Sequence, residues 1–170
     1  LKNKLGKLIF DKLIASVVLF FSIPIFLIIK LAYFIEGVFD SSSKGPIFFY
    51  YNAISQGKVI PKYKIRLIKM KFIDTEGAKK HDWLAYSAEW TEESRTYVGQ
   101  FVKKFYLDEI PQFWSVLIGD MSIVGPRPTL HNQHELIAKR AALGVNQLRP
   151  GVTGWAQING RDEIALQENF

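Results

Sequence analysis

The chain has 170 residues, which is enough for one domain with a modest core. Its 22 Lys and Arg residues against 16 Asp and Glu give a net charge of +6. Such a basic excess is typical of proteins that bind phosphate-bearing ligands or an anionic membrane surface. Nucleic acid is a less favoured partner, because no arginine-rich helix or recognisable nucleic-acid motif is present. The lack of cysteine excludes disulfides and thiolate metal sites.

An uncharged apolar run extends from Leu13 to Ile29. At ~1.5 Å per residue a helix of this run spans roughly 26 Å, slightly less than the ~30 Å of a bilayer's hydrocarbon core. Pro24 predicts a kink, and the hydroxyl of Ser22 can bond a carbonyl that the proline frees. Lysines flank both ends, so the positive-inside rule favours neither orientation. A kinked spanning helix and a bent helix that enters and leaves on the same face both fit the sequence.

Two strands are predicted in the region after this run. Ile47–Tyr51 is rich in β-branched and aromatic residues, and a turn at Gln56-Gly57 separates it from Val59–Phe72. The second segment alternates apolar and basic residues, which predicts a half-exposed strand with a positive outer face. Its basic residues either lie at a solvated sheet edge, where their charges discourage pairing with another strand, or face and bind phosphate. They are Lys62, Lys64 and Arg66.

A polar segment, residues 74–96, follows the predicted strands. Its Trp83, Tyr86 and Trp90 are spaced three and four residues apart, which predicts one face of a helix. Such a face packs into a core or, beside a membrane segment, lies at the level of the lipid headgroups.

Residues 107–128 are the most informative stretch of the chain. Asp108 and Glu109 precede apolar residues at helical spacing, and we expect this helix to end at Gly119. With Asp108 as the N-cap, Pro111 falls in the first turn, where its missing N–H costs nothing. The acids then either cap the helix, or one attacks a phosphoryl group while the other holds a metal or a proton. Local physics does not choose between these two interpretations.

The C-terminal part has a helical pattern over residues 131–143 that ends at Gly144, followed by a loop rich in glycine at residues 148–163. His131 and His134 have no evident third ligand, so we interpret them, like His81, as surface residues. The loop is dense in planar groups that bind phosphate, a nucleobase or a sugar, which favours a ligand site over a purely structural loop. These polar residues are Arg149, Thr153, Gln157, Asn159 and Arg161.

Seven motifs occur in order: Phe10-Asp11, Pro24, Gly45–Phe48, Tyr63–Arg66, Leu107–Gln112, Gly119–Pro128 and Arg149–Arg161. With them the sequence resembles the bacterial sugar transferases that are monotopic phosphoglycosyl transferases. Those enzymes move a sugar phosphate from a nucleotide diphosphate sugar to a polyprenyl phosphate. The resemblance covers nearly the whole chain, and the last three motifs are long and specific.

The resemblance implies an α+β fold, in which a small catalytic domain of short strands and several helices occupies residues 40–170. Residues 1–39 would form a re-entrant, monotopic membrane helix with its flanks. The implied location is the bacterial inner membrane, with the catalytic domain on the cytoplasmic face. The chain starts at Leu1 rather than Met, and a family Asp would fall just beyond Phe170. We therefore expect it to be a fragment that is truncated at the C-terminus.

The same resemblance assigns roles to single residues. Asp108 would attack a UDP-sugar with release of UMP, and Glu109 would help to bind Mg²⁺. Undecaprenyl or another polyprenyl phosphate would then take the sugar phosphate from the aspartyl intermediate, in the first membrane step of glycoconjugate synthesis. Ser22 and Pro24 would form the membrane bend, in contact with membrane lipids, while a homo-oligomer is neither required nor excluded. The expected substrate-binding residues are Lys64, Arg66, Lys103, Arg127, Arg149, Gln157, Asn159 and Arg161.

Three positions depart from the family pattern. Ile23 stands directly before the proline, where the family has Ser. Lys103 replaces an Arg and so loses its planar fork, and the usual Arg is missing between Tyr50 and Gly57. A membrane-anchored, non-catalytic binding or scaffold protein with the same pocket is the alternative function. Mg²⁺-dependent release of UMP from a UDP-sugar distinguishes the two.

Overall fold

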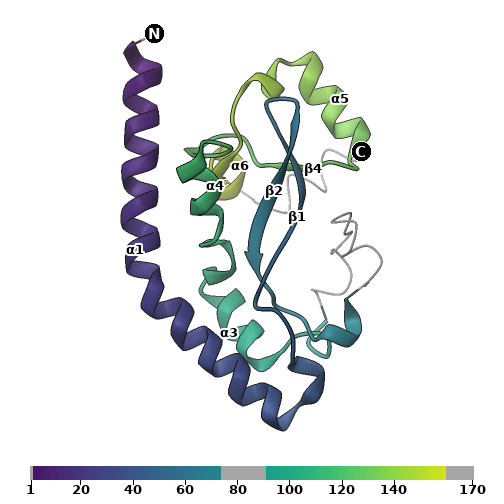
Figure 1. Cartoon of the computed structure of the whole chain (residues 1–170). Helices are drawn as coiled ribbons and strands as arrows, with labels where there is room; N and C mark the ends of the chain where they lie inside the picture. Colours follow the sequence, from purple (N-terminus) through teal and green to yellow (C-terminus); the bar gives the residue numbers. More distant parts are fainter. Residues whose placement is uncertain (1, 74–90, 160–170) are drawn as a thin grey trace.

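The computed structural model describes residues 2–73 and 91–159, in which a long N-terminal helix runs along a domain of helices and short strands (Figure 1). The predicted mixture of helices and strands is confirmed. The helices are α1 (Lys2–Phe39), α3 (Tyr97–Lys104), α4 (Gln112–Ile118), α5 (His134–Ala142) and α6 (Trp155–Ile158). The strands are β1 (Phe48–Ser55), β2 (Lys58–Ile65), β3 (Ser122–Val124), β4 (Thr129–Leu130) and β5 (Gly151–Thr153).

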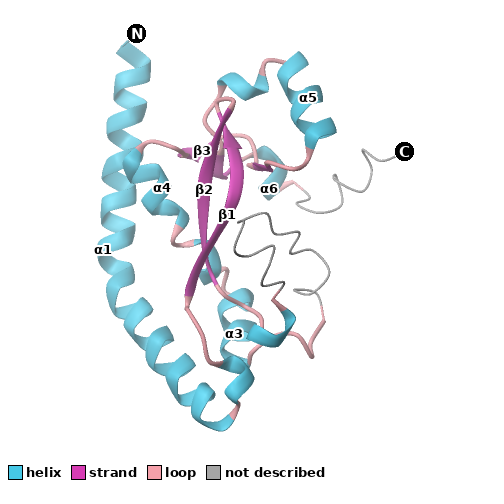
Figure 2. Ribbon diagram, turned by 45° about the vertical axis from the view of Figure 1, so that its right-hand side comes forward, coloured by secondary structure: helices cyan, strands magenta, loops and turns pink. Residues whose placement is uncertain are grey.

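Helix α1 contains Pro24 and bends part-way along its length, as predicted (Figures 1 and 2). The hydroxyl of Ser22 donates to the carbonyl of Val18 at 2.6 Å. The prediction that it would bond a carbonyl freed by the proline is therefore wrong, because Pro24 frees the carbonyl of Phe20. A hydroxyl bonded to the carbonyl four residues earlier also bends a helix. Ser22 and Pro24 thus act on the same part of α1.

The outward face of α1 is apolar and exposed. Among the described residues, α1 is the helix that is long and apolar enough to cross a membrane, and only 17% of its most apolar stretch is buried. A core helix of a soluble protein would be mostly buried, so this face has no partner within the described parts of the chain. Its large exposed side chains include Phe20, Phe21, Ile23, Leu27, Ile28, Leu31 and Phe34.

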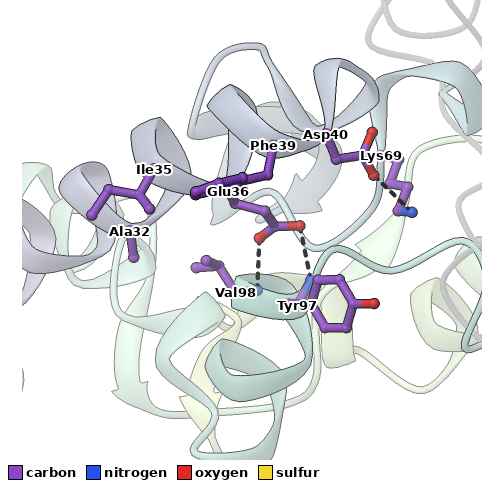
Figure 3. A pocket seen from close by; sticks show the side chains of 8 residues that line it. All are labelled: Ala32, Ile35, Glu36, Phe39, Asp40, Lys69, Tyr97 and Val98. Carbon is purple, nitrogen blue, oxygen red and sulfur yellow. Dashed lines mark hydrogen bonds and ion pairs between the residues drawn. The ribbon is translucent and has the colours of Figure 1, made fainter.

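Two buried carboxylates attach α1 to the domain, one towards each end. Asp11 accepts hydrogen bonds from the hydroxyl of Ser122 at 2.8 Å and from the N–H of Ile123 at 3.2 Å, both in β3. Glu36 accepts hydrogen bonds from the first two N–H groups of α3 at 3.0 and 2.9 Å (Figure 3). It also accepts one from the hydroxyl of Ser43 at 2.9 Å. The free N–H groups and the dipole at a helix start favour a carboxylate there. One domain therefore holds both ends of α1.

The two sheets are small. Strands β1 and β2 form an antiparallel hairpin with the predicted turn at Gln56-Gly57, and β4 pairs with β1 in the order β2-β1-β4. The predicted second strand ends earlier than expected, at Ile65, because the chain then turns out of the sheet. Strand β3 pairs in parallel with β5, and α6 follows directly. The glycine-rich segment expected to be a loop thus contains regular structure.

Two lysines of β2 and the arginine directly after the strand point into the protein, and the prediction of a positive outer face is wrong. Lys62, Lys64 and Arg66 are only 6, 8 and 1% exposed. On the same hairpin face, Ala53 and Ile60 belong to a hydrophobic cluster that includes residues of α4. Helix α4 lies between α1 and the hairpin in both views (Figures 1 and 2). The charged face of β2 is therefore the face that packs against α4.

The aromatic spacing of Trp83, Tyr86 and Trp90 lies outside the described residues, as does His81. Residues 91–96 form turns and an isolated bridge. Helix α3 was not predicted from the sequence, although its cap is a common one. The hydroxyl of Thr96 accepts the N–H of Gly99 at 2.7 Å.

We expect Glu36→Ala to lower the free energy of unfolding by about 3 kcal/mol, because the start of α3 loses a charged hydrogen-bond acceptor. The measurement is denaturant unfolding of the detergent-solubilised protein. The matched control is Glu93→Ala at an exposed position, which should change the stability by less than about 0.5 kcal/mol. A Glu36→Ala protein as stable as the parent would contradict the capping role.

Candidate active site

Asp108 lies in a short 3-10 helix, Leu107–Glu109, that leads into α4. The expectation that Asp108 caps the following helix is wrong, because the residue at the N-cap of α4 is Pro111. Proline has no N–H, so regular α-helical hydrogen bonding begins after it. The predicted helix end at Gly119 is confirmed. This glycine has a φ of 99°, the left-handed conformation that closes many helices.

The carboxylate of Asp108 is completely buried, and neither oxygen has a hydrogen-bond partner in the part of the chain that the structure describes. Positive charge compensates it instead. The Nζ atoms of Lys64 and Lys103 lie 3.4 and 3.9 Å from its Oδ2 atom. A buried charge without hydrogen bonds is costly, and in native proteins such a group usually has a catalytic or ligand-binding reason. Within the described residues, hydrogen bonds thus leave the lone pairs of this carboxylate unused.

The buried face of α4 is polar next to Asp108. One turn beyond it, the Nε2 atom of Gln112 is buried and has no hydrogen-bond partner among the described residues. Ser115 and Val116 complete this face, whereas Trp114 is 50% exposed. Of the apolar residues at helical spacing, Phe113 and Leu117 pack against a hydrophobic cluster that includes Val116, whereas Trp114 lies at the surface. The helical spacing therefore marks the side of α4 that faces the domain, apart from Trp114.

Tyr51 of β1 contributes to the same site, although the sequence had not singled it out. It lies on the hairpin face that carries Lys62 and Lys64. Burial raises the pKa of the Tyr51 hydroxyl, but the positive charges of the two lysines outweigh burial and lower this pKa below its usual value. The charge of Glu109 acts in the opposite direction. The phenol therefore lies in the combined field of both lysines and of Glu109.

The guanidinium of Arg66 is turned away from the carboxylates. It donates to the backbone carbonyls of Ser43 and Ile68, each at 2.6 Å, and to that of Pro46 at 2.9 Å. It also lies 4.9 Å from the ring centroid of Tyr33. These contacts occupy the guanidinium of Arg66, and substrate binding by this residue stays a prediction. The side chain joins the end of α1 to the hairpin.

The expected residues Arg127 and Arg149 belong to a second group, around the parallel pair β3–β5. Backbone hydrogen bonds of 2.9 and 3.0 Å join residues 125–126 to residues 151–153 and bring the two arginine-bearing segments together. Both arginines are half-buried. Among the described residues, no ion pair links either arginine to Asp108 or Glu109.

The remaining residues expected to bind substrate are close in sequence but differ in their surroundings. The Oε1 atom of Gln157 is buried and has no hydrogen-bond partner within residues 2–73 and 91–159. The exposed Asn159 donates its side-chain N–H to the carbonyl of Trp155 at 3.1 Å. Arg161 lies outside the described residues. Of these residues, Gln157 is therefore the one whose buried oxygen could accept a hydrogen bond from a bound substrate.

The adjacent carboxylates of Asp108 and Glu109 fit only one mode of metal binding. The described residues contain no group of three or more His, Cys, Asp or Glu side chains that could hold a metal ion. Mg²⁺, however, is usually bound by one or two carboxylates together with substrate phosphates. The pair is therefore compatible with Mg²⁺ that arrives with a phosphorylated substrate.

A pocket of about 600 Å³ lies between the end of α1 and the start of α3, away from Asp108 (Figure 3). An ion pair of 3.0 Å joins Asp40 and Lys69 on its wall. Hydrogen bonds from Ser42 and Lys69 lower the pKa of Asp40 to about 2, so this carboxylate stays charged at neutral pH. The pocket residues are Ala32, Ile35, Glu36, Phe39, Asp40, Lys69, Tyr97 and Val98, and the acidic pair is not among them.

A comparison with protein families decides the family membership of the chain. The model of the family described as "Bacterial sugar transferase" matches residues 2–170. The chain belongs to the bacterial sugar transferase family. The resemblance based on the sequence motifs is thereby confirmed.

Characterised relatives of this bacterial sugar transferase share about a third of its residues. The UDP-glucose:undecaprenyl-phosphate glucose-1-phosphate transferase of Escherichia coli strain K12 is 35% identical over 161 residues, which are 93% of this chain and 32% of the relative. The exopolysaccharide production protein ExoY of Sinorhizobium fredii is 31% identical over 95% of this chain and 72% of its own length. The undecaprenyl-phosphate galactose phosphotransferase of Salmonella typhimurium is 33% identical over 71% of this chain and 27% of its own length. This chain thus spans about a third of the Escherichia coli protein.

We expect Gly151→Ala to disrupt the β3–β5 pair of this sugar transferase. A Cβ atom at residue 151 would lie 2.1 Å from the backbone nitrogen of Gly125, so one of the two segments must move. The stability should fall by about 1 to 3 kcal/mol, the usual cost of overpacking. The measurement is thermal unfolding in detergent. The control is Gly6→Ala in α1, which has no atom within 4 Å of the new methyl group and should be at least as stable as the parent, because Ala favours a helix over Gly.

Proposed function

We propose that this chain carries the catalytic part of a phosphoglycosyl transferase. It transfers a sugar 1-phosphate from a UDP-sugar to polyprenyl phosphate at the bacterial inner membrane. The observation that carries the proposal is the buried Asp108 carboxylate, which has no hydrogen-bond partner among the described residues and lies beside two lysines. The names of the relatives, which specify undecaprenyl phosphate and a sugar-phosphate transfer, support the substrate class.

In the first step an oxygen of Asp108 attacks the phosphorus atom that bears the sugar. A new P–O bond to the carboxylate forms as the bond to the bridging oxygen of the diphosphate breaks, and UMP leaves with that electron pair. An anion here attacks an anionic group, so the reaction needs nearby positive charge. Lys64 and Lys103, at 3.4 and 3.9 Å from Oδ2, supply it.

In the second step a phosphate oxygen of the polyprenyl phosphate attacks the same phosphorus atom. The P–O bond to Asp108 breaks and the carboxylate is regenerated, while the lipid carries the sugar on a diphosphate. Because one carboxylate serves both steps, the two substrates react one after the other. This sequence is a ping-pong mechanism.

Glu109 would help to hold Mg²⁺ together with the diphosphate. When bound, Mg²⁺ would offset negative charge on the phosphate oxygens. The half-buried position of Glu109, directly beside the buried nucleophile, suits a carboxylate that meets the ion as the substrate enters.

We infer that α1 enters and leaves the membrane on the cytoplasmic face, where the UDP-sugar is found. Its attachments through Asp11 and Glu36 to one domain support this re-entrant arrangement. A straight helix of 38 residues would be roughly 57 Å long at ~1.5 Å per residue, so α1 exceeds the ~30 Å hydrocarbon core. In the bent helix the exposed apolar face contacts lipid, and neither end has to cross the bilayer.

We expect Asp108→Asn to lower UMP release from a UDP-sugar at least about a hundred-fold, because an amide is a poor nucleophile. Without polyprenyl phosphate, label from the sugar phosphate should remain on the parent protein and be absent from the variant. Glu109→Gln should chiefly raise the Mg²⁺ concentration required. The control, Asp40→Asn, makes the same chemical change at the end of α1 and should retain activity.

A folded Asp108→Asn protein that keeps more than a few per cent of the parent's activity would exclude this nucleophile. A parent protein that binds UDP-sugars but releases no UMP from any of a panel of them would favour a non-catalytic binding protein.

We expect Pro24→Ala to shift α1 towards a straight, spanning helix, because it restores the missing backbone donor and removes the ring clash. The chain has no cysteine, so Lys2→Cys provides a single site for an impermeant maleimide in intact cells. The site should be protected with Pro24 present and labelled more strongly with Pro24→Ala. Strong labelling with Pro24 in place would overturn the re-entrant arrangement, whatever the outcome for the chemistry.

A further inference from the structure

Lys62 and Tyr51 face each other across the β1–β2 hairpin and have no part in the mechanism above. They are direct cross-strand partners, and the Nζ atom of Lys62 lies 5.6 Å from the centroid of the Tyr51 ring. Lys62 is only 6% exposed. Packing against its neighbours therefore fixes the position of the Lys62 side chain.

Lys62 lies on the side of the hairpin that faces the candidate active site. Residues two apart in a strand point to the same face, roughly 7 Å from each other. The side chain of Lys62 therefore lies on the same face of β2 as that of Lys64, whose ammonium group pairs with Asp108 at 3.4 Å. Next to it, the carbonyl of Pro61 accepts a hydrogen bond of 3.4 Å from Ser115 of α4. The part of β2 that carries Lys62 and Lys64 thus packs against the buried face of α4.

The charge of Lys62 lacks a carboxylate partner. Lys64 and Lys103 pair with Asp108, whereas no ion pair involves Lys62 within residues 2–73 and 91–159. The aromatic ring of Tyr51 only partly offsets the cost of burying an ammonium group. A buried cation of this kind is suited to an anion that comes from outside the chain. In a site that binds a nucleotide diphosphate, the phosphates are that anion.

We propose that Lys62, held by Tyr51, binds the nucleotide-side phosphate of the donor, the phosphate that leaves in UMP. The inference rests on the proposed function. Lys64 is beside Asp108 and therefore next to the phosphorus that is attacked, and Lys62, one position farther along the same face, reaches the neighbouring phosphate. Its charge stabilises the leaving group as the bond to the sugar phosphate breaks. The second step has no nucleotide and does not use Lys62.

The test compares Lys62→Met with Lys58→Met in the full chain, purified in detergent with Mg²⁺. Both changes remove a lysine from the same face of β2, but Lys58 is exposed at the hairpin turn. Loss of a charge-assisted contact should raise the KM for the UDP-sugar and the inhibition constant of UMP about ten- to a hundred-fold for Lys62→Met. Lys58→Met should leave both constants unchanged. Lys62→Arg should recover part of the loss.

Two further readouts separate binding of the nucleotide phosphate from a structural effect. UMP should protect the parent and Lys58→Met against thermal unfolding, but not Lys62→Met, whose midpoint without UMP should match that of the parent. When Lys62→Met protein that is already labelled on Asp108 is mixed with polyprenyl phosphate, the label should move to the lipid at the same rate as from the labelled parent. Tyr51→Phe, which keeps the ring, should weaken UMP binding less than Lys62→Met does.

Unchanged UMP inhibition in Lys62→Met, or an equal loss in the transfer of label to the lipid, would overturn the inference while the proposed function stands. A parent protein that releases no UMP would instead overturn the proposed function. The two failures are therefore distinguishable in one set of measurements.

Discussion

Compensation of the buried Asp108 charge is the constraint on which the arrangement of this protein depends. Its carboxylate has no hydrogen-bond partner in the described residues, so nearby positive charge has to stabilise it. One lysine, Lys64, comes from β2 and the other, Lys103, from the last turn of α3. The hairpin, α3 and the start of α4 must therefore pack in one relative position before the site exists.

Helix α1 is connected to that site by hydrogen bonds rather than by apolar packing alone. Glu36 binds the first turn of α3, and Lys103 lies in the last turn of the same short helix. Asp11 binds β3, which pairs with β5 and positions the segments of Arg127 and Arg149. The helix that exposes an apolar face to its surroundings thus also supports both groups of expected ligands. Membrane attachment and site geometry depend on the same contacts.

Features that depend on neighbouring residues were predictable from the sequence. The long apolar helix and its bend follow from hydropathy and Pro24, and the end of α4 follows from Gly119. The alternation of apolar and basic residues in β2 was also predicted correctly, but the face of the strand that is buried was not. A period of two shows that the two faces of a strand differ, and polar faces usually meet water. Here the charged face is buried, and Lys64 on this face pairs with Asp108.

By itself, the sequence determined the family, the bent N-terminal helix and the acidic pair as the candidate for chemistry. Only the tertiary structure decided which cations meet Asp108, that Arg66 binds backbone carbonyls, and that Tyr51 and Lys62 lie on the hairpin face of Lys64. The physical reason is the distance along the chain that separates the interacting residues. Helix ends, turns and periodicity arise within a few residues, whereas charge compensation acts through space between elements that are distant in sequence.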